Sequence, residues 1–351
     1  RADLQRQKSE LSNSKKTTSM IMGDNPPNKM RKTYILDRGA YDAPKKEEEI
    51  PAGTPAALPA IDPKAPQNRL TLAKWIFSDD HPLTSRVMAN RIWHHLFGAG
   101  IVRTMDNFGA TGERPTHPGL LDYLAVRFVG NDWSVKSMIR EMVLSRTYQL
   151  SSDTMDANAA ADPSNRFLWR MNHKRLGAEA LRDAMLATSG RLDRQPPGGS
   201  VVTKLGNVNV GRAQRQLSQM QRNTSQRSVY LPILRNALPE MMRLFDTAEP
   251  SLIVGKRNET TVPTQALYLM NNPFVIGQAF NMAKRVMDTA EGRPDGIRLA
   301  YELAFARAAT DDEVSRAHEF LNSVAEEKDR PGQWTVLCQA LLASAEFRYI
   351  D

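Results

Sequence analysis

Histidines, arginines, asparagines and an aspartate gather in one short stretch of this chain, and these side chains could do chemistry. Asp106, with Asp122 or Glu113, could supply the acid and base of a glycosidase-like cleft. His94, Asp106 and His117 could meet as a two-histidine, one-carboxylate metal site. Neither spacing dictates a reaction, so we predict no metal and leave the catalytic residues unknown. The candidate polar site comprises Arg86, Asn90, Arg91, His94, Asp106, Asn107 and His117.

Two interpretations of this candidate site remain open. On a helix, Arg86, Asn90 and His94 form a column along one flank of an apolar face, with Arg91 and His95 on the other flank. Polar groups at such an edge are partly desolvated and need partners. They either bond to loops of their own chain or point into a ligand cleft. We predict one buried network in which Arg91 and Asp106 pin the 103–117 loop onto the helix.

A second polar concentration lies further along the chain. Asparagine, glutamine and threonine side chains in turns usually bond to the local backbone. They also recognise sugar hydroxyls, since they both donate and accept hydrogen bonds. We place the local structural role first. The residues are Arg257, Asn258, Thr264, Gln265, Asn271 and Asn272.

Helices must position these side chains. Residues 82–97 carry a broad apolar face at helical spacing, and Gly98 and Gly100 suit the helix end. We predict further helices over 118–129, with Thr116 as N-cap, and from Ser134 to about residue 146. The 103–117 loop should lie over these helices. Downstream helices are predicted over 176–189, 237–245, 274–287, 294–308, 311–326, with a capping box at Thr310, and 331–347.

Several sequence blocks occur in a recognisable order. N-R-I-W-H-H-L-F-G begins at Asn90, D-N-F-G at Asp106, P-T-H-P at Pro115, and D-P-S-N-R-F-L-W-R-M at Asp162. Together they resemble a planctomycete surface-protein domain of unknown function, usually found at the C-terminal end of large proteins that carry cytochrome c-like domains. The resemblance covers roughly residues 20–351. It implies an extracytoplasmic location and partners among the other domains of the parent assembly, but no settled activity.

Composition and charge narrow the functional classes. The chain has 351 residues, of which 41% are hydrophobic and 25% charged, as in ordinary globular proteins. The formal net charge of +8 is compatible with an anionic partner, such as an acidic glycan. However, the arginines are spread along the chain, which favours solvated surface charges. Nucleic acid is a poorer candidate, because no basic helix or zinc finger is evident. No apolar run is long enough to span a bilayer.

The single cysteine limits the possible cofactors. One thiol, Cys338, allows neither an intrachain disulfide nor the C-x-x-C-H attachment of c-type haem. We therefore predict no cofactor in this chain, and any haem on a neighbouring domain or partner chain. Cys338 lies among apolar residues and is predicted to be a buried core thiol. Because residue 1 is an arginine, we expect a processed or excised piece.

The predicted fold is mainly α, a multi-helix body with a small β element and a long Pro-rich extended segment. Residues 1–32 are the tail of an upstream region, 33–67 a strand and Pro-rich strap, and 68–351 the helical body. That body subdivides into core helices (68–190), an irregular insertion with a strand (191–262, exposed over 201–226) and C-terminal helices (263–351). We predict that strands at 33–36 and 228–231 pair.

Two functional hypotheses follow. The first is a non-catalytic accessory or scaffold module that docks to its cytochrome-like neighbours. The second is an enzyme of unknown reaction that acts on an anionic polysaccharide. Convergence of the candidate polar residues in a deep pocket would favour the enzyme. A filled cluster whose groups pair with one another would favour the scaffold.

Overall fold

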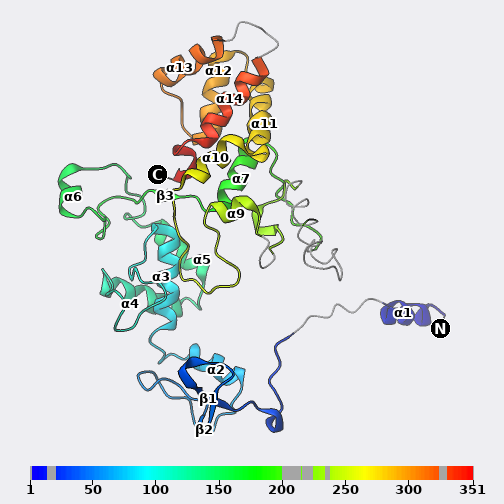
Figure 1. Ribbon diagram of the computed structural model, residues 1–351, viewed down its shortest axis with the longest axis vertical. Coiled ribbons are helices and arrows are strands. Elements are labelled where there is room, and N and C mark those ends of the chain that lie inside the picture. The colour runs from blue at the N-terminus through cyan, green and yellow to red at the C-terminus, as the bar shows by residue number, and fades with distance from the viewer. Residues whose placement is uncertain are drawn as a thin grey trace. The chain divides into compact units, whose positions relative to one another are not determined.

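The computed structural model describes residues 2–13, 21–199, 215, 224–233, 238–323 and 330–350. Over these residues the protein is mainly α-helical, with two small antiparallel sheets, so the predicted fold class is confirmed. The chain divides into two units, residues 1–86 and 87–351, each described separately (Figure 1). Most of the predicted 201–226 excursion lies outside the described residues.

The first unit contains a β-hairpin. Strand β1 (Thr33–Leu36) pairs with β2 (Pro44–Ile50), and Thr33 lies opposite Ile50. The predicted pairing with residues 228–231 is wrong, because a tight reversal after β1 supplies a nearby partner. Charged residues fill β2, and Lys32 pairs with Glu49 at 2.7 Å. The other elements are α1 (Ala2–Asn13), η1 (Pro27–Lys29), η2 (Asp37–Gly39) and α2 (Arg69–Ile76).

The Pro-rich segment of the first unit runs against α2. The side chain of Asn68 caps this helix by accepting a hydrogen bond from the Thr71 amide at 2.9 Å. The Trp75 indole donates to the Pro59 carbonyl at 2.6 Å. Leu58 and Ile61 are half-buried, so this stretch is held to the helix by a hydrogen bond and apolar side chains.

The second unit holds its first apolar core between α3 (Thr84–Phe97), α4 (Pro118–Gly130) and α5 (Val135–Val143). α3 starts two residues later than predicted and ends at Gly98, whose φ of 80° suits glycine. Ser134 caps α5 as predicted. The predicted N-cap at Thr116 is wrong, since His117 takes that position and the Thr116 amide donates to the Ile101 carbonyl. The core includes Ile92, Trp93, Phe97, Leu121, Phe128 and Met138.

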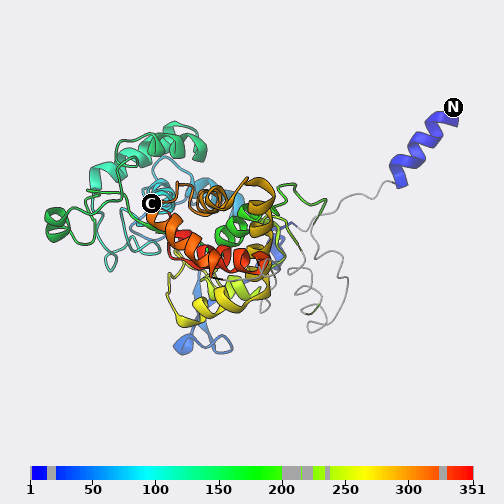
Figure 2. The same ribbon diagram turned by 90° about the horizontal axis from the view of Figure 1, so that it is seen from above.

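A second core joins α7 and α9 through α14, whereas α6 contributes no buried residue to it. α11 (Pro273–Thr289) packs along α14 (Arg330–Ala343), and Figure 1 shows the two helices side by side, as does the view from above in Figure 2. Cys338 is fully buried there, as predicted, and burial raises the pKa of its thiol to about 12. The helices are α6 (Asp156–Ala161), α7 (Ala178–Thr188), α9 (Glu240–Leu244), α10 (Pro263–Asn271), α11 (Pro273–Thr289), α12 (Arg293–Phe305), α13 (Asp311–Asn322) and α14 (Arg330–Ala343).

Short elements complete the second unit. β3 (Lys174–Arg175) pairs with β4 (Tyr349–Ile350), next to the 3-10 helix η6 (Glu346–Arg348). The strand predicted at 228–231 is wrong, because Ser228–Tyr230 forms the 3-10 helix η4. The Ser228 amide donates to Asp183 at 2.7 Å, and the buried guanidinium of Arg182 donates to its hydroxyl at 3.2 Å. Asp183 on α7 thus binds a backbone amide that a strand would use for pairing.

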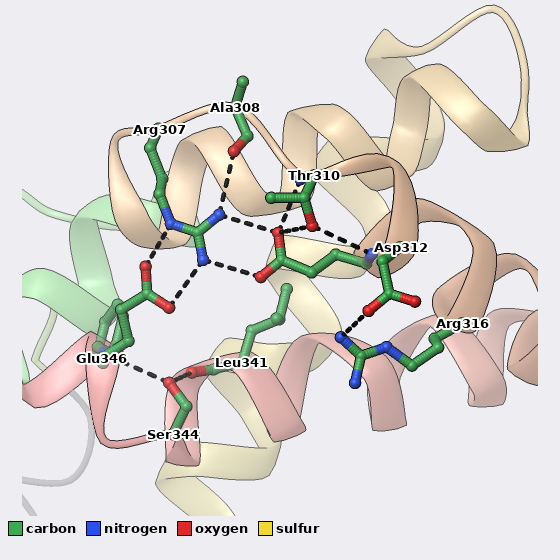
Figure 3. Close-up of polar contacts among 10 residues, drawn as sticks. Arg307, Ala308, Thr310, Asp312, Arg316, Leu341, Ser344 and Glu346 are labelled. Carbon is green, nitrogen blue, oxygen red and sulfur yellow. Dashed lines mark hydrogen bonds and ion pairs between the residues drawn. The ribbon is translucent and has the colours of Figure 1, made fainter.

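One arginine joins three elements at the end of the chain (Figure 3). Arg307 donates two hydrogen bonds to Glu346 and two to Glu313, at 2.5–2.9 Å. Glu313 also completes the predicted capping box by accepting from the Thr310 amide at 2.8 Å. We call Arg307, Glu313 and Glu346 the clamp. It links the segment after α12 to the start of α13 and to η6.

Candidate functional site

Asn90 lies at the centre of the predicted polar site, on the buried face of α3. Its amide nitrogen donates to the Val102 carbonyl, and its amide oxygen accepts from the Val102 amide, both at 2.9 Å. The side chain is fully buried. Gly100 provides the space, because a Cβ there would collide with this amide. Asn90 therefore fastens the chain that follows α3, and its polar atoms are used inside the fold.

Asp106 binds a distant loop. Its carboxylate accepts a hydrogen bond of 2.8 Å from the amide of Gly255, 149 residues further along the chain. A Cβ at position 255 would collide with that carboxylate and displace it, so glycine permits this close contact. The predicted network with Arg91 is wrong: Arg91 is exposed, and among the described side chains no ion pair joins it to Asp106. The partner of Asp106, Gly255, lies in a distant segment that no local sequence pattern identifies.

The loop that meets Asp106 spans residues 247–262 and is held at further points. Arg257 forms a two-point ion pair with Glu179, at 2.5 and 2.9 Å. Asp246 accepts hydrogen bonds from the amide and hydroxyl of Thr260, at 2.8 and 2.9 Å. Between these anchors, Leu252, Ile253 and Val254 are 66%, 103% and 45% exposed. The loop is therefore fixed at its base while its apolar tip faces solvent.

Asp246 also belongs to a buried network of hydrogen bonds and one ion pair. The guanidinium of Arg175 pairs with the Asp246 carboxylate at 3.2 Å, and these side chains are only 6% and 14% exposed. Arg175 also donates to the Thr260 carbonyl and lies over the ring of Phe245. Gln265, 1% exposed, donates to the carbonyls of Leu244 and Thr260 at 2.8 and 3.0 Å. This part of the polar concentration is structural.

Positive groups gather around the end of α3. The amine of Lys174 donates to the His95 carbonyl. Burial lowers the pKa of His94, and the neighbouring His95, Lys256 and Lys174 lower it further. Burial together with Lys174, Arg257 and Arg91 lowers the pKa of His95 in the same way. Burial and the positive neighbours thus favour the uncharged form of both imidazoles. The fixed charge at this place comes from lysine and arginine.

The 103–117 loop is internally bonded. The hydroxyl of Thr104 donates to the Asn107 carbonyl at 2.7 Å and accepts from the Glu113 amide at 2.9 Å. The side chain of Asn107 accepts from the Gly109 amide at 2.9 Å, and its amide nitrogen donates to Thr111 at 2.8 Å. Asn107 thus forms a local turn, and the loop holds its own shape.

His117 lies elsewhere, in a small cleft between the chain after α3 and the 162–172 loop. Its Nδ1 contacts the Thr116 hydroxyl at 3.0 Å, and its ring meets Phe167 edge-on. Arg103 and Arg166 also line the cleft. The other lining residues are Trp93, Ala99, Gly100, Ile101, Thr116, Asn165, Leu168 and Asn172.

The structure does not gather the predicted site into one pocket. His117 lines the cleft, whereas Asp106 binds Gly255 and His94 lies with Lys174 and Lys256. No group of three His, Cys, Asp or Glu side chains among the described residues is placed to hold a metal ion. His94, Asp106 and His117 thus do not form the two-histidine, one-carboxylate group among the described residues. Arg86 belongs to the first unit and donates to the Pro82 carbonyl at 2.6 Å.

In the second polar concentration, two asparagines bond to nearby backbone groups. Asn272 caps α11 by accepting from the Phe274 amide at 2.9 Å. Asn271 donates to the Leu267 carbonyl one helical turn earlier. Thr264 and Asn258 are exposed. Asn271 and Asn272 thus bond to the local backbone, and Arg257 and Gln265 belong to the loop anchors described above.

Sequence reasoning missed several residues that define these sites. Arg103, Arg166 and Lys174 were not singled out, and neither was the pairing of Arg175 with Asp246. One signal was present: the D-P-S-N-R-F-L-W-R-M block contains Arg166 and most of the cleft's outer wall. A second was Leu252, Ile253 and Val254 directly before Gly255, an apolar run followed by a turn residue.

Comparisons with known proteins give one result. A family model described as PSD1, a protein of unknown function (DUF1553), matches residues 68–321, which is more than half of the chain. Searches among curated proteins and among solved structures find no match. Within the described part of the chain, no helix has the length and apolar character needed to cross a membrane.

Proposed function

Because the chain belongs to the PSD1 family of proteins of unknown function (DUF1553), its role must be argued from its own geometry, and we propose that it is a non-catalytic interaction module. The carrying observation is the tip of the 247–262 loop, where Leu252, Ile253 and Val254 are exposed. Exposed apolar residues that adjoin one another are typical of protein interaction sites. We call these three residues the docking tip.

The anchoring of the loop supports docking. Asp106 holds Gly255 immediately after the tip, Glu179 holds Arg257, and Asp246 holds Thr260. A loop that is already fixed loses little conformational freedom when a partner binds, which improves affinity. The same anchors occupy polar groups that a catalytic site would need free. This supports a module over an enzyme.

Lys256, which is exposed beside the docking tip, favours an acidic group on the partner at that point. Lys256 follows the tip, and Lys174 is half-buried close to Glu259, His94 and His95. Arg257 is neutralised by Glu179, so Lys256 supplies the main exposed charge, and Glu249 lies on the other side of the tip. The chain as a whole carries +8. Charge of opposite sign on a partner would speed and orient docking.

The partner that we propose is another domain of the parent protein. The resemblance described from the sequence implies a cytochrome c-like domain and an extracytoplasmic location, where that neighbour would carry any haem. An apolar patch with an acidic rim on such a domain would match the docking tip. The alternative, an enzyme that acts on an anionic polysaccharide, draws support from the two arginines and the histidine that line the cleft.

Binding of the 351-residue chain to the cytochrome c-like domains of its parent protein tests the proposal. Ile253→Ser should weaken binding by at least about 10-fold, since the loss of a buried aliphatic anchor costs 1.4 kcal/mol or more. Val126→Ser is the matched control, because Val126 is also a highly exposed aliphatic residue, on α4. Equal effects of the two changes, or no binding by the unmodified chain, would contradict docking through the tip.

Assays on acidic polysaccharides distinguish the interaction module from the alternative, an enzyme. If the chain is an interaction module, no reducing ends will be released. Turnover that Arg103→Gln or His117→Ala abolishes while Ile253→Ser leaves it intact would establish the enzyme instead.

A further inference from the structure

We propose that the cleft lined by Arg103, Arg166 and His117 binds a single oxyanion group, a carboxylate, sulfate ester or phosphate ester, at the end of a larger ligand. This site is separate from the docking tip and goes beyond the interaction role. Its walls come from the chain that follows α3, from residues 116 and 117, and from the 162–172 loop.

The two arginines of the cleft have few partners of their own. Arg103 donates one hydrogen bond, to the Ser164 carbonyl at 3.0 Å, and forms no ion pair with a described carboxylate. The guanidinium of Arg166 is 3.9 Å from Glu113, and both side chains are nearly half exposed, so this contact is weak. A guanidinium offers five N–H donors. Most of these donors therefore remain for a ligand.

Asp162, an acidic residue near the cleft, is bonded to the protein's own backbone. The carboxylate of Asp162 accepts from the Phe167 amide at 2.9 Å, and its pKa is lowered mainly by backbone hydrogen bonds from Phe167 and Arg166. Asp162 and Glu113 reduce the local positive charge, but neither lines the cleft. The first turn of α4, directly after His117, contains no acidic residue. The cleft is thus bounded by cationic and neutral groups.

The wall of the cleft is rigid. Asn165, which is buried, donates to the Arg170 carbonyl at 2.8 Å and to the side chain of Asn172 at 2.9 Å. Asn172 donates in turn to the carbonyl of Phe97 at the end of α3. Asn165 and Leu168 both adopt positive φ, 47° and 55°. Asparagine tolerates this conformation, but leucine is strained in it, and strain of this kind collects at binding sites.

The chemical class of ligand follows from the donors and the size. A guanidinium matches two oxygens of a carboxylate, sulfate or phosphate. The cleft has room for about one water molecule, so the oxyanion would rest at its opening against Arg103 and Arg166, while the remainder of the ligand stays outside. Trp93 and Leu168 supply an apolar wall on which the carbon skeleton next to the oxyanion would rest.

Calorimetric or chemical-shift titrations of the complete 351-residue chain at low salt test this site, with glucuronate, glucose 6-sulfate and glucose 6-phosphate as probes and glucose as the neutral control. We expect millimolar binding of at least one anionic probe, no binding of glucose, and weakening at higher salt. The probe that binds best identifies the carboxylate, sulfate or phosphate source.

Variants locate the binding. Arg103→Gln and Arg166→Gln should each weaken it by about 10-fold or more, the effect of losing a charge-assisted hydrogen bond. Arg103→Lys keeps the charge but loses the planar fork, and it should also weaken binding. Arg140→Gln, at an exposed arginine on α5, is the matched control and should leave affinity unchanged. Melting temperatures establish that each variant is folded.

The outcomes are decisive. Absence of binding by the unmodified chain, or equal loss in the Arg140→Gln control, would overturn the proposal. Ile253→Ser should leave anion affinity unchanged, so this proposal and the docking tip succeed or fail independently.

Discussion

The clamp and the cleft use the same residue type in opposite ways. In the clamp, Arg307 donates four hydrogen bonds to two carboxylates and a fifth to the Ala308 carbonyl. In the cleft, Arg103 bonds to one carbonyl, and Arg166 faces a single carboxylate at 3.9 Å. An arginine whose donors are all used fixes the fold, whereas one with donors left over can bind a ligand. Mutations should therefore reduce stability in the first group and binding in the second.

The largest effect on stability is expected from Arg175→Ala. Arg175 and Asp246 form a buried ion pair, with side chains 6% and 14% exposed. Removing one partner leaves a buried, uncompensated carboxylate, which costs roughly 3–5 kcal/mol. Chemical denaturation measures this change. Asp246→Ala should cost a similar amount, and the double variant should lose much less than the sum. Additive losses would mean that the two groups act separately.

Asn90→Ala should be the next most damaging change. It leaves both the N–H and the carbonyl of Val102 without partners in a buried place. We expect a loss of about 2–4 kcal/mol from two unpaired groups and a cavity. Denaturation midpoints of Asn90→Ala and of Asn107→Ala, a turn residue on a half-exposed loop, allow the comparison. Near-equal costs would mean that Asn90 does not fasten the chain after α3.

Arg307→Ala should cost less, because the guanidinium is 38% exposed and its ion pairs are screened by water. The expected loss is roughly 1–2 kcal/mol at pH 7. Arg316→Ala provides a control, since Arg316 pairs with Asp312 on the surface, where both side chains are at least 70% exposed. That variant should lie within about 0.5 kcal/mol of the unmodified protein.

The clamp should also depend on pH. Hydrogen bonds from Arg307 lower the pKa of Glu313 to about 2, from an ordinary 4.5. The carboxylate thus stabilises the fold above pH 4.5, and this contribution is lost as the pH falls towards 2. The difference in melting temperature between the unmodified chain and Glu313→Gln should be greatest near pH 7 and shrink by pH 3. A difference that grows on acidification would contradict the assignment.

Arg103→Gln and Arg166→Gln should have the smallest effects on stability, within about 0.5–1 kcal/mol, because their contacts are few and partly exposed. Thermal unfolding measures them beside Arg307→Ala. A loss as large as that of Arg307→Ala would remove the distinction between the two regions, since the cleft arginines would then be structural.

Local features of this protein could be read from its sequence, and distant pairings could not. The helices, the Ser134 cap and the capping box at Thr310 follow from residues a few positions apart. The Asp106 carboxylate, by contrast, binds a backbone amide 149 residues away and not the nearby Arg91. The spacing of residues along the sequence does not indicate such a distant pairing. Ser228 likewise became part of a 3-10 helix because Arg182 and Asp183 hold it.

For the candidate site too, the sequence indicated local features but not the pairing of distant segments. His117, which was among the candidate residues, lines the cleft, but the arginines that complete this cleft lie on other segments, at 103 and 166. The docking tip was missed because exposed apolar residues are common in any sequence. Its significance comes only from the anchors that hold Gly255, Arg257 and Thr260.

Hydrogen–deuterium exchange on the chain mixed with the partner that we propose, a cytochrome c-like domain, tests the central claim most directly. The account predicts that binding slows amide exchange in residues 247–262 and at the end of α3, where His94 and His95 lie, while α12 and α13 exchange as in the free chain. Protection confined to α12 and α13, with the 247–262 loop unchanged, would contradict the claim that this chain docks through Leu252, Ile253 and Val254.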